Sequence, residues 1–183
     1  VAAGMLNPSR HPFYRHSQAA FFLAESSSGE AVGRLAVLEN RHYNDYNHER
    51  TAFFYLFECQ PDAPAANELF AAGMHWARES CLEKIIGPKG FTTLDGMGLL
   101  VRGFEHRPAF GIPYNPAYYP QMLLDMGFTT SPEVLSGYLD RNVQFPEKVF
   151  EVARRVQDRR GLYVSNFRTR GELRRMLPGL KEM

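Results

Sequence analysis

The sequence has only two cysteines, Cys59 and Cys81, and they do not form a Cys-x-x-Cys pair. Such sparse cysteines argue against a disulfide framework or a zinc site, and they predict reduced thiols in a cytoplasmic protein. The chain also lacks a run of about 18 apolar residues, so we expect no membrane-spanning helix and no membrane partner. Its first residues contain no basic segment followed by an apolar stretch, which argues against a signal peptide.

Apolar and aromatic side chains, by contrast, are abundant and make up 44% and 13% of the 183 residues. This composition excludes an intrinsically disordered segment. A chain of this length can bury most of the apolar surface that its unfolded form exposes. We therefore expect a folded domain over residues 1–140, with a core rich in Phe.

Charge is spread unevenly along the chain. Residues 1–140 hold 10 Lys and Arg against 15 Asp and Glu, whereas residues 141–183 hold 11 against 5. The basic segment could attract phosphates, dock on the acidic body or on a second half, or form a solvated face. We favour docking or solvation and rank nucleic acid last, because no recognisable reader motif surrounds the arginines.

Apolar runs bounded by turn residues predict six strands. They cover residues 19–25, 31–40, 51–60, 84–88, 133–140 and 162–167. The first two flank a short polar turn and so predict a β-hairpin. The run at 51–60 is apolar on both faces, which predicts a central strand that is covered on both sides. The strand–helix–strand unit over residues 51–88 favours parallel pairing.

Helical spacing and capping residues predict the helices. The first starts after Asp62, an N-cap residue, with Pro64 in its first turn. The second begins near Pro116 or Ala117, and Gly127 ends it in the left-handed conformation.

Two further helices are predicted in residues 141–183. One begins near Pro146 and stops at Gly161, and the other starts from a capping box formed by Thr169 and Glu172. The inward face of the former consists of Val149, Ala153 and Val156. Together the elements predict an α/β or α+β fold, in which helices pack on a mixed sheet. We interpret residues 141–183 as a basic helix–strand–helix extension, or as the start of a second half.

The polar segment 41–50 is predicted to be an irregular connection. It contains His42, Asp45 and His48 at spacings of three. A loop does not bring such side chains together as a helix would, so we expect no metal site there.

Several stretches of the sequence resemble the GNAT acyltransferase superfamily. “VGRLAVLEN” is similar to the hairpin strand of that fold, “FFYLFECQ” to its central strand and “LLDMGF” to the helix that ends in Gly-Phe. The segments “RHPFYRH”, “GP…GLLVRGF” and “YNPAYY” resemble a bacterial group of GNAT-like proteins without an assigned reaction. Members of that group usually carry a second GNAT-like half. The resemblance covers about residues 8 to 140.

The resemblance implies a twisted sheet with helices on both faces, in which two central parallel strands splay apart. Acetyl-CoA or another acyl-CoA would lie between them and donate its acyl group to the amine of a small molecule or peptide. The strand backbone from Leu56 to Glu58 would pair with the pantetheine arm, and residues 62 to 67 would meet the phosphates. The residues expected at the coenzyme are Leu56, Phe57, Gln60, Ala63, Ala65, Ala66, Asn115 and Tyr118.

Two positions depart from the superfamily's pattern. Its phosphate loop is Gln/Arg-x-x-Gly-x-Gly/Ala, whereas this chain has “CQPDAPAAN”, where Gln60 could stand for the first position and both glycines are missing. Such glycines let backbone N–H groups approach a pyrophosphate, while Asp62 adds negative charge and Pro64 removes a donor. The tyrosine that often protonates the leaving thiolate is replaced by Leu123, four residues before Gly127.

Glu58 is the candidate general base. It lies near the C-terminal end of the predicted central strand, where ligands collect in open sheets. Among Phe54, Leu56 and Phe57, its carboxylate would be desolvated and its pKa raised, which suits proton removal from an amine. The alternative is a strand-end carboxylate that meets an arginine or water.

Tyr119 is the candidate acid. Tyr118 and Tyr119 precede Gly127 by nine and eight residues, so they reach the thiol side only if their helix begins late or is shifted. The alternative is that both rings serve packing alone.

Two functions are compatible with these observations. The first is a GNAT-like N-acyltransferase that uses Glu58 as base and Tyr119 as acid. The second is a GNAT-like binding or packing module that has lost coenzyme A chemistry. Such a module predicts a homodimer or packing against a second GNAT-like half, because a partner surface would otherwise be exposed.

Overall fold

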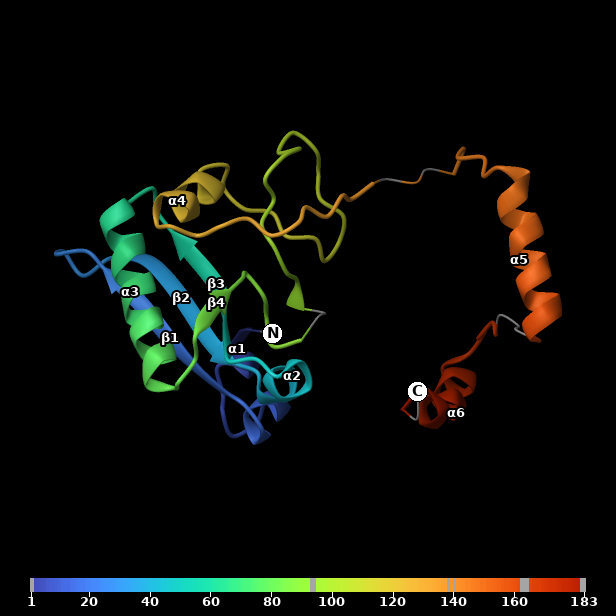
Figure 1. Cartoon of the computed structure of the whole chain (residues 1–183), viewed down its shortest axis with the longest axis horizontal. Coiled ribbons are helices and arrows are strands. Elements are labelled where there is room, and N and C mark those ends of the chain that lie inside the picture. Colours follow the sequence, from blue (N-terminus) through green and yellow to red (C-terminus); the bar gives the residue numbers. More distant parts are fainter. Residues whose placement is uncertain (1, 93–94, 138, 140, 162–164, 182–183) are drawn as a thin grey trace. The chain divides into compact units, whose positions relative to one another are not determined.

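The computed structural model describes the chain except for residues 1, 93–94, 138, 140, 162–164 and 182–183. The chain divides into two compact units, Val1–Ser131 and Pro132–Met183. The first unit is built on a four-stranded mixed sheet with helices (Figure 1), and this confirms the predicted α+β class.

The strands of the sheet lie side by side in sequence order. They are β1 Gln18–Glu25, β2 Ala31–Glu39, β3 Thr51–Cys59 and β4 Lys84–Ile86. β1 and β2 form the predicted antiparallel hairpin, β2 and β3 are also antiparallel, and β3 pairs with β4 in parallel. Because side chains alternate along β3, Phe54 packs in the core cluster under one face while Phe53 packs in the cluster under the other.

Helix α3, Ala63–Glu79, lies across one face of the sheet (Figure 1). It begins where predicted, since the Asp62 carboxylate accepts a hydrogen bond from the Ala65 N–H at 3.0 Å. The side chains that α3 buries lie along one face of the helix, namely Ala66, Leu69, Phe70 and Ala77. Gly73 fits between the layers because an added Cβ would lie 2.7 Å from Val37.

Helix α4, Tyr119–Asp125, packs on the same core cluster as α3. Gly127 follows it with φ at +89°, as predicted. The predicted start near Pro116 or Ala117 is wrong, because the helix begins at Tyr119. Pro120 then occupies its first turn, where the missing N–H of proline is tolerated.

The opposite face of the sheet is covered by short elements. These are α1 Ala2–Met5, the 3-10 helix η1 Pro12–Arg15 and α2 Arg41–Asn47. The rings of Phe13 and Phe91 stack there with centroids 4.3 Å apart, next to Phe53 of β3. Both faces of β3 are therefore covered, which explains why its sequence is apolar without alternation.

The prediction that residues 41–50 form an irregular connection is wrong for Arg41–Asn47, which form α2. The side chain of Asn40 accepts a hydrogen bond from the Tyr43 N–H at 3.1 Å and so caps this helix. The polar composition of the segment gave no apolar periodicity, and the Asn cap was the signal that we overlooked.

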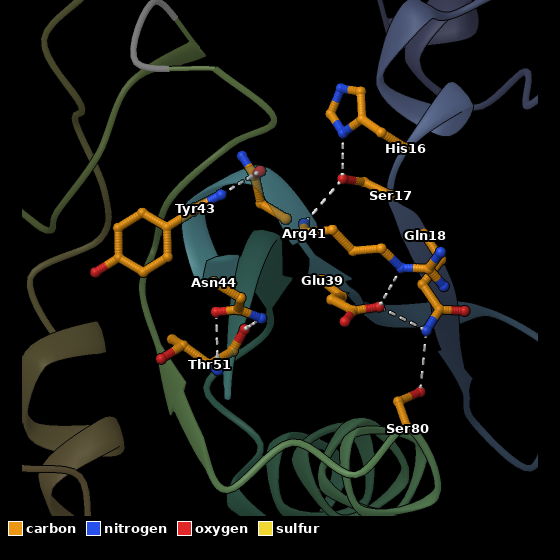
Figure 2. Close-up of polar contacts among 10 residues, drawn as sticks. His16, Ser17, Gln18, Glu39, Arg41, Tyr43, Asn44, Thr51 and Ser80 are labelled. Carbon is orange, nitrogen blue, oxygen red and sulfur yellow. Dashed lines mark hydrogen bonds and ion pairs between the residues drawn. The ribbon is translucent and has the colours of Figure 1, made fainter. Parts of the chain in front are cut away.

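A polar network fastens one end of the sheet to α2 and α3 (Figure 2). The buried Asn44 amide accepts a hydrogen bond from Thr51 N at 3.0 Å and donates one to Thr51 O at 3.1 Å. On β1, the amide of Gln18 donates to Glu39 at 2.9 Å and to Ser80 at 3.4 Å. The start of β3 is therefore tied to its neighbours, whereas the functional candidates lie at its other end.

We expect Asn44→Ala to lower the free energy of unfolding by about 1–3 kcal/mol, because it leaves the buried N–H and C=O of Thr51 without partners. Urea denaturation measures this change. Asn47→Ala is the matched control, since the exposed Asn47 amide donates to a carbonyl within α2 and its loss should change stability by less than about 0.5 kcal/mol. Equal effects of the two substitutions would contradict the prediction.

The second unit contains α5 Glu147–Arg160 and α6 Arg170–Lys181. α5 ends before Gly161 as predicted, and the capping box is confirmed, since Glu172 N donates to the Thr169 hydroxyl at 3.2 Å. The predicted inward face of α5 is wrong, because α5 buries none of its side chains and Val149 is 50% exposed.

Neither strand predicted after residue 131 is present in the described residues. Residues 133–137 and 139 form no strand, nor do residues 165–167, and the other positions of these two predictions lie outside the described residues. Among the helices that the structure describes, none is both long and apolar enough to cross a bilayer.

Candidate functional site

The parallel strands β3 and β4 separate after a short paired stretch. They pair at three positions only, the last of which joins Phe53 to Ile86. The Lys89 N–H then donates to the Phe54 carbonyl at 2.8 Å. Gly87 lies against the same carbonyl, where an added Cβ would lie 2.5 Å from the oxygen. The second half of β3 therefore has no partner from β4, in keeping with the splayed strands that we expected.

A β-bulge interrupts β3 where the two strands have separated. Leu56 and Phe57 both stand opposite the single residue Leu35 of β2. Leu56 has φ at +52°, a left-handed conformation that is strained for a bulky side chain. Bulges of this kind bend a strand and turn its side chains, and they are common next to active sites.

Two cavities meet at this end of β3. The slot cavity, of about 360 Å³, is bordered by the bulge and by residues 95–99 and 111–115. The hairpin cavity, of about 570 Å³, is bordered by residues 31–34 and 57–61. Both cavities are lined by Phe57, Glu58, Tyr114, Asn115 and Tyr119. The structure thus brings the two candidate catalytic residues to one boundary.

Glu58 does not lie in the apolar surroundings that we expected. Its side chain is 67% exposed, and its Oε1 atom lies 2.8 Å from Nη2 of Arg34. The prediction of a desolvated carboxylate is wrong because the bulge places Glu58 opposite Arg34 on β2, on the open side of the strand. The structure agrees instead with the alternative prediction, in which Glu58 is a carboxylate at the strand end that pairs with an arginine.

Two tyrosine hydroxyls hold the backbone of Cys59. Cys59 N donates to the Tyr119 hydroxyl at 2.8 Å, and the Tyr118 hydroxyl donates to the Cys59 carbonyl at 2.7 Å. Tyr119 reaches this position because α4 begins late. Burial raises the pKa of both phenols above the usual value near 10, so both keep their protons at neutral pH.

The raised pKa of Tyr119 predicts a loss of stability in alkali. The phenol of the unfolded chain ionises near pH 10, before the folded one, so the free energy of unfolding should fall as the pH rises above about 10. Tyr119→Phe should flatten this alkaline decline, whereas Tyr46→Phe, which alters a ring that is 85% exposed, should leave it unchanged. Denaturation at pH 8 to 11 measures the decline, and identical curves for the two variants would contradict the prediction.

The other predicted residues are divided between the cavities and α3. Leu56 and Phe57 line the slot cavity, while Gln60 and Tyr118 line the hairpin cavity. The residues that line neither cavity are Ala63, Ala65 and Ala66. The N-terminus of α3, where phosphates were expected, is instead closed by the carboxylate of Asp62, which binds an N–H of the helix itself.

Asn115 connects the two loop segments that border the slot cavity, residues 95–99 and 111–115. Its side chain accepts a hydrogen bond from the Leu100 N–H at 2.8 Å and donates to the carbonyls of Leu100 and Pro116 at 3.3 and 3.0 Å. Since Asn115 as a whole is only 8% exposed and its amide makes these three hydrogen bonds, it shapes the cavity more than it offers a free group to a ligand.

Arg34 is the site residue that sequence reasoning missed. It borders the hairpin cavity and pairs with Glu58. The bulge decides that Arg34 faces Glu58, and no sequence signal marks a bulge that is formed by a leucine. In the described part of the chain, no group of three or more His, Cys, Asp or Glu side chains is placed to hold a metal ion.

The chain is similar to two curated bacterial proteins. It is 26% identical over 143 residues to a protein named bacterial ceramide synthase from Caulobacter vibrioides, a match that covers 78% of this chain and 37% of that protein. It is 25% identical over 115 residues to the protein YghO of Escherichia coli, covering 62% of this chain and 29% of YghO. The chain therefore spans about a third of the length of these relatives. No family model and no solved structure matches it.

Proposed function

We propose that the first unit is a GNAT-like domain that moves an acyl group from an acyl-CoA to an amine. The observation that carries this proposal is the end of β3, where Glu58 and Tyr119 border the slot cavity beside two separated strands. The similarity to a ceramide synthase supports it, because a ceramide is an amide of an acyl group and an amine.

In this proposal the donor's thioester arm enters the slot cavity along the bulged edge of β3. Leu56 and Phe57 line the cavity there and offer their backbone for pairing with the arm. The pantetheine does not pair with Cys59, because the hydroxyls of Tyr118 and Tyr119 already bind its N–H and carbonyl.

Glu58 takes a proton from the ammonium form of the acceptor. The freed nitrogen attacks the carbonyl carbon of the thioester, so that a C–N bond forms and the C–S bond breaks. Tyr119 gives its phenolic proton to the departing sulfur. The new amide nitrogen then releases its second proton, which returns to Tyr119 through solvent. The Tyr119 oxygen accepts from Cys59 N at 2.8 Å, and its O–H donates only a long hydrogen bond to the Cys59 carbonyl, with 3.4 Å between the two oxygens. That proton is therefore available for transfer.

Isothermal titration with acetyl-CoA tests this proposal. We expect saturable binding to the 183-residue chain, and competition between acetyl-CoA and free CoA. No heat of binding at millimolar ligand, both for this chain and for a longer protein that contains it, would remove the proposal.

A second candidate is a module without coenzyme A chemistry that packs against a second GNAT-like half. It is supported by the closed N-terminus of α3 and by the exposed apolar side chains of α5 and α6. These side chains include Val149, Phe150, Val156, Leu173 and Leu177. The isolated chain would then dimerise, as measured by light scattering, or bind an apolar dye, as measured by fluorescence. A monomer that binds no dye would count against this candidate.

A further inference from the structure

A phosphate-bearing donor needs positive charge or free N–H groups near the mouth of the site. The N-terminus of α3 does not supply them, because the Asp62 carboxylate occupies the Ala65 N–H at 3.0 Å and Pro64 has no N–H. The phosphate contact must therefore come from another part of the first unit.

Arg34 is the only lysine or arginine among the described residues that line either cavity. Its side chain is 50% exposed and its Nη2 atom pairs with Glu58 Oε1. The hairpin cavity, which Arg34 borders, meets the slot cavity along their shared lining at Phe57, Glu58 and Tyr119. A ligand with its thioester in the slot cavity can thus extend its charged end toward Arg34.

We propose that Arg34 binds a phosphate group of the acyl donor, and that this binding releases Glu58 to act as the base. The inference rests on the proposed acyl-transfer function. Before the donor binds, the Arg34 guanidinium engages the carboxylate oxygen that must accept the proton. When a phosphate takes the guanidinium, Glu58 Oε1 becomes free to accept a proton from the amine.

The exchange is physically favourable. An ion pair between two side chains that are both half exposed or more is weak, because water screens it. A guanidinium binds a phosphate through two parallel N–H···O bonds, and the phosphate carries more charge than a carboxylate. Donor binding therefore costs little in breaking the resting pair. The exchange also makes the base available only once the acyl donor is present.

Acetyl-CoA and S-acetylpantetheine, which has the same thioester arm without phosphates, distinguish this inference from its alternatives in titration calorimetry. Arg34→Gln should weaken acetyl-CoA binding about tenfold or more, the loss expected for a charge-assisted hydrogen bond, and leave S-acetylpantetheine unchanged. Glu58→Gln should strengthen acetyl-CoA binding, because it removes the carboxylate that competes for Arg34. A merely structural pair would not give these opposite effects.

Arg50→Gln is the matched control. Arg50 is 59% exposed and forms the same kind of ion pair with Glu83 at 3.0 Å, near the start of β3, so its loss should leave both affinities unchanged. Arg34→Gln with wild-type affinity for acetyl-CoA, or with equal losses for both ligands, would overturn the role of Arg34 while acyl-CoA binding stands. If the wild type binds neither ligand at millimolar concentration, the acyl-transfer function fails together with this inference.

Discussion

Replacing Glu58 by Gln is expected to lower the rate of acyl transfer by about 10²–10⁴-fold, the usual contribution of a positioned general base. Gln has nearly the same shape as Glu but cannot take a proton from the ammonium group. The defect should lie in kcat. The substitution alters only the carboxylate that pairs with Arg34, and it leaves Leu56 and Phe57, which line the slot cavity, unchanged. A thiol-release assay with acetyl-CoA and an amine acceptor measures the rate.

Glu83→Gln is the control for this experiment. Glu83 is 69% exposed and pairs with Arg50, so the substitution removes a carboxylate of matching exposure at the far end of the sheet. The control should keep wild-type rates. A Glu58→Gln protein that is folded and as active as the Glu83→Gln protein would remove Glu58 from the mechanism.

Phe70→Ala is expected to lower the free energy of unfolding by about 3–5 kcal/mol, as for other large-to-small changes in a core. The Phe70 ring, on α3, lies about 5 Å from the rings of Phe54, Phe57 and Phe128. Alanine would leave a cavity where β3, α3 and the end of α4 meet. Since typical domains are stable by only about 5–15 kcal/mol, much of the stability would be lost.

Guanidinium denaturation followed by circular dichroism measures this effect. Phe110→Ala is the matched control, because the Phe110 ring is fully exposed and its removal should change stability by less than about 0.5 kcal/mol. Phe70→Ala with a midpoint close to that of Phe110→Ala would contradict the described core.

Sequence reasoning was most successful where the signal is local. The turn between the first two apolar runs, the N-cap Asp62 and the helix-ending glycines Gly127 and Gly161 each specify a structure through a few neighbouring residues. The double-sided apolar run at 51–60 likewise sufficed to place β3 at the centre of the first unit, with both faces covered.

The arrangement of the candidate site could not be predicted in the same way. Whether Glu58 meets Arg34 or an apolar wall depends on one extra residue in β3, because a bulge reverses which side chains face the open side of the strand. Similarly, Tyr119 reaches Cys59 only because α4 begins at Tyr119. Both facts follow from the register of distant segments, which local patterns do not encode.

The prediction that one face of α5 is buried was wrong for a different physical reason. The spacing of Val149 and Val156 correctly predicts an amphipathic helix, but periodicity does not say what covers the apolar face. In the described residues of the second unit, nothing buries α5. The candidate of a packing module requires such an uncovered apolar face, because a second GNAT-like half would have to cover it.

The most direct test of the central claim is a backbone ¹H–¹⁵N NMR titration of the chain with acetyl-CoA. The account predicts that the amide signals of Leu56, Phe57 and Glu58 shift first, with those of Arg34 and Tyr119, because the thioester arm lies along the separated edge of β3. Signals that stay in place at these positions in millimolar acetyl-CoA, or shifts confined to the N-terminus of α3, would contradict it.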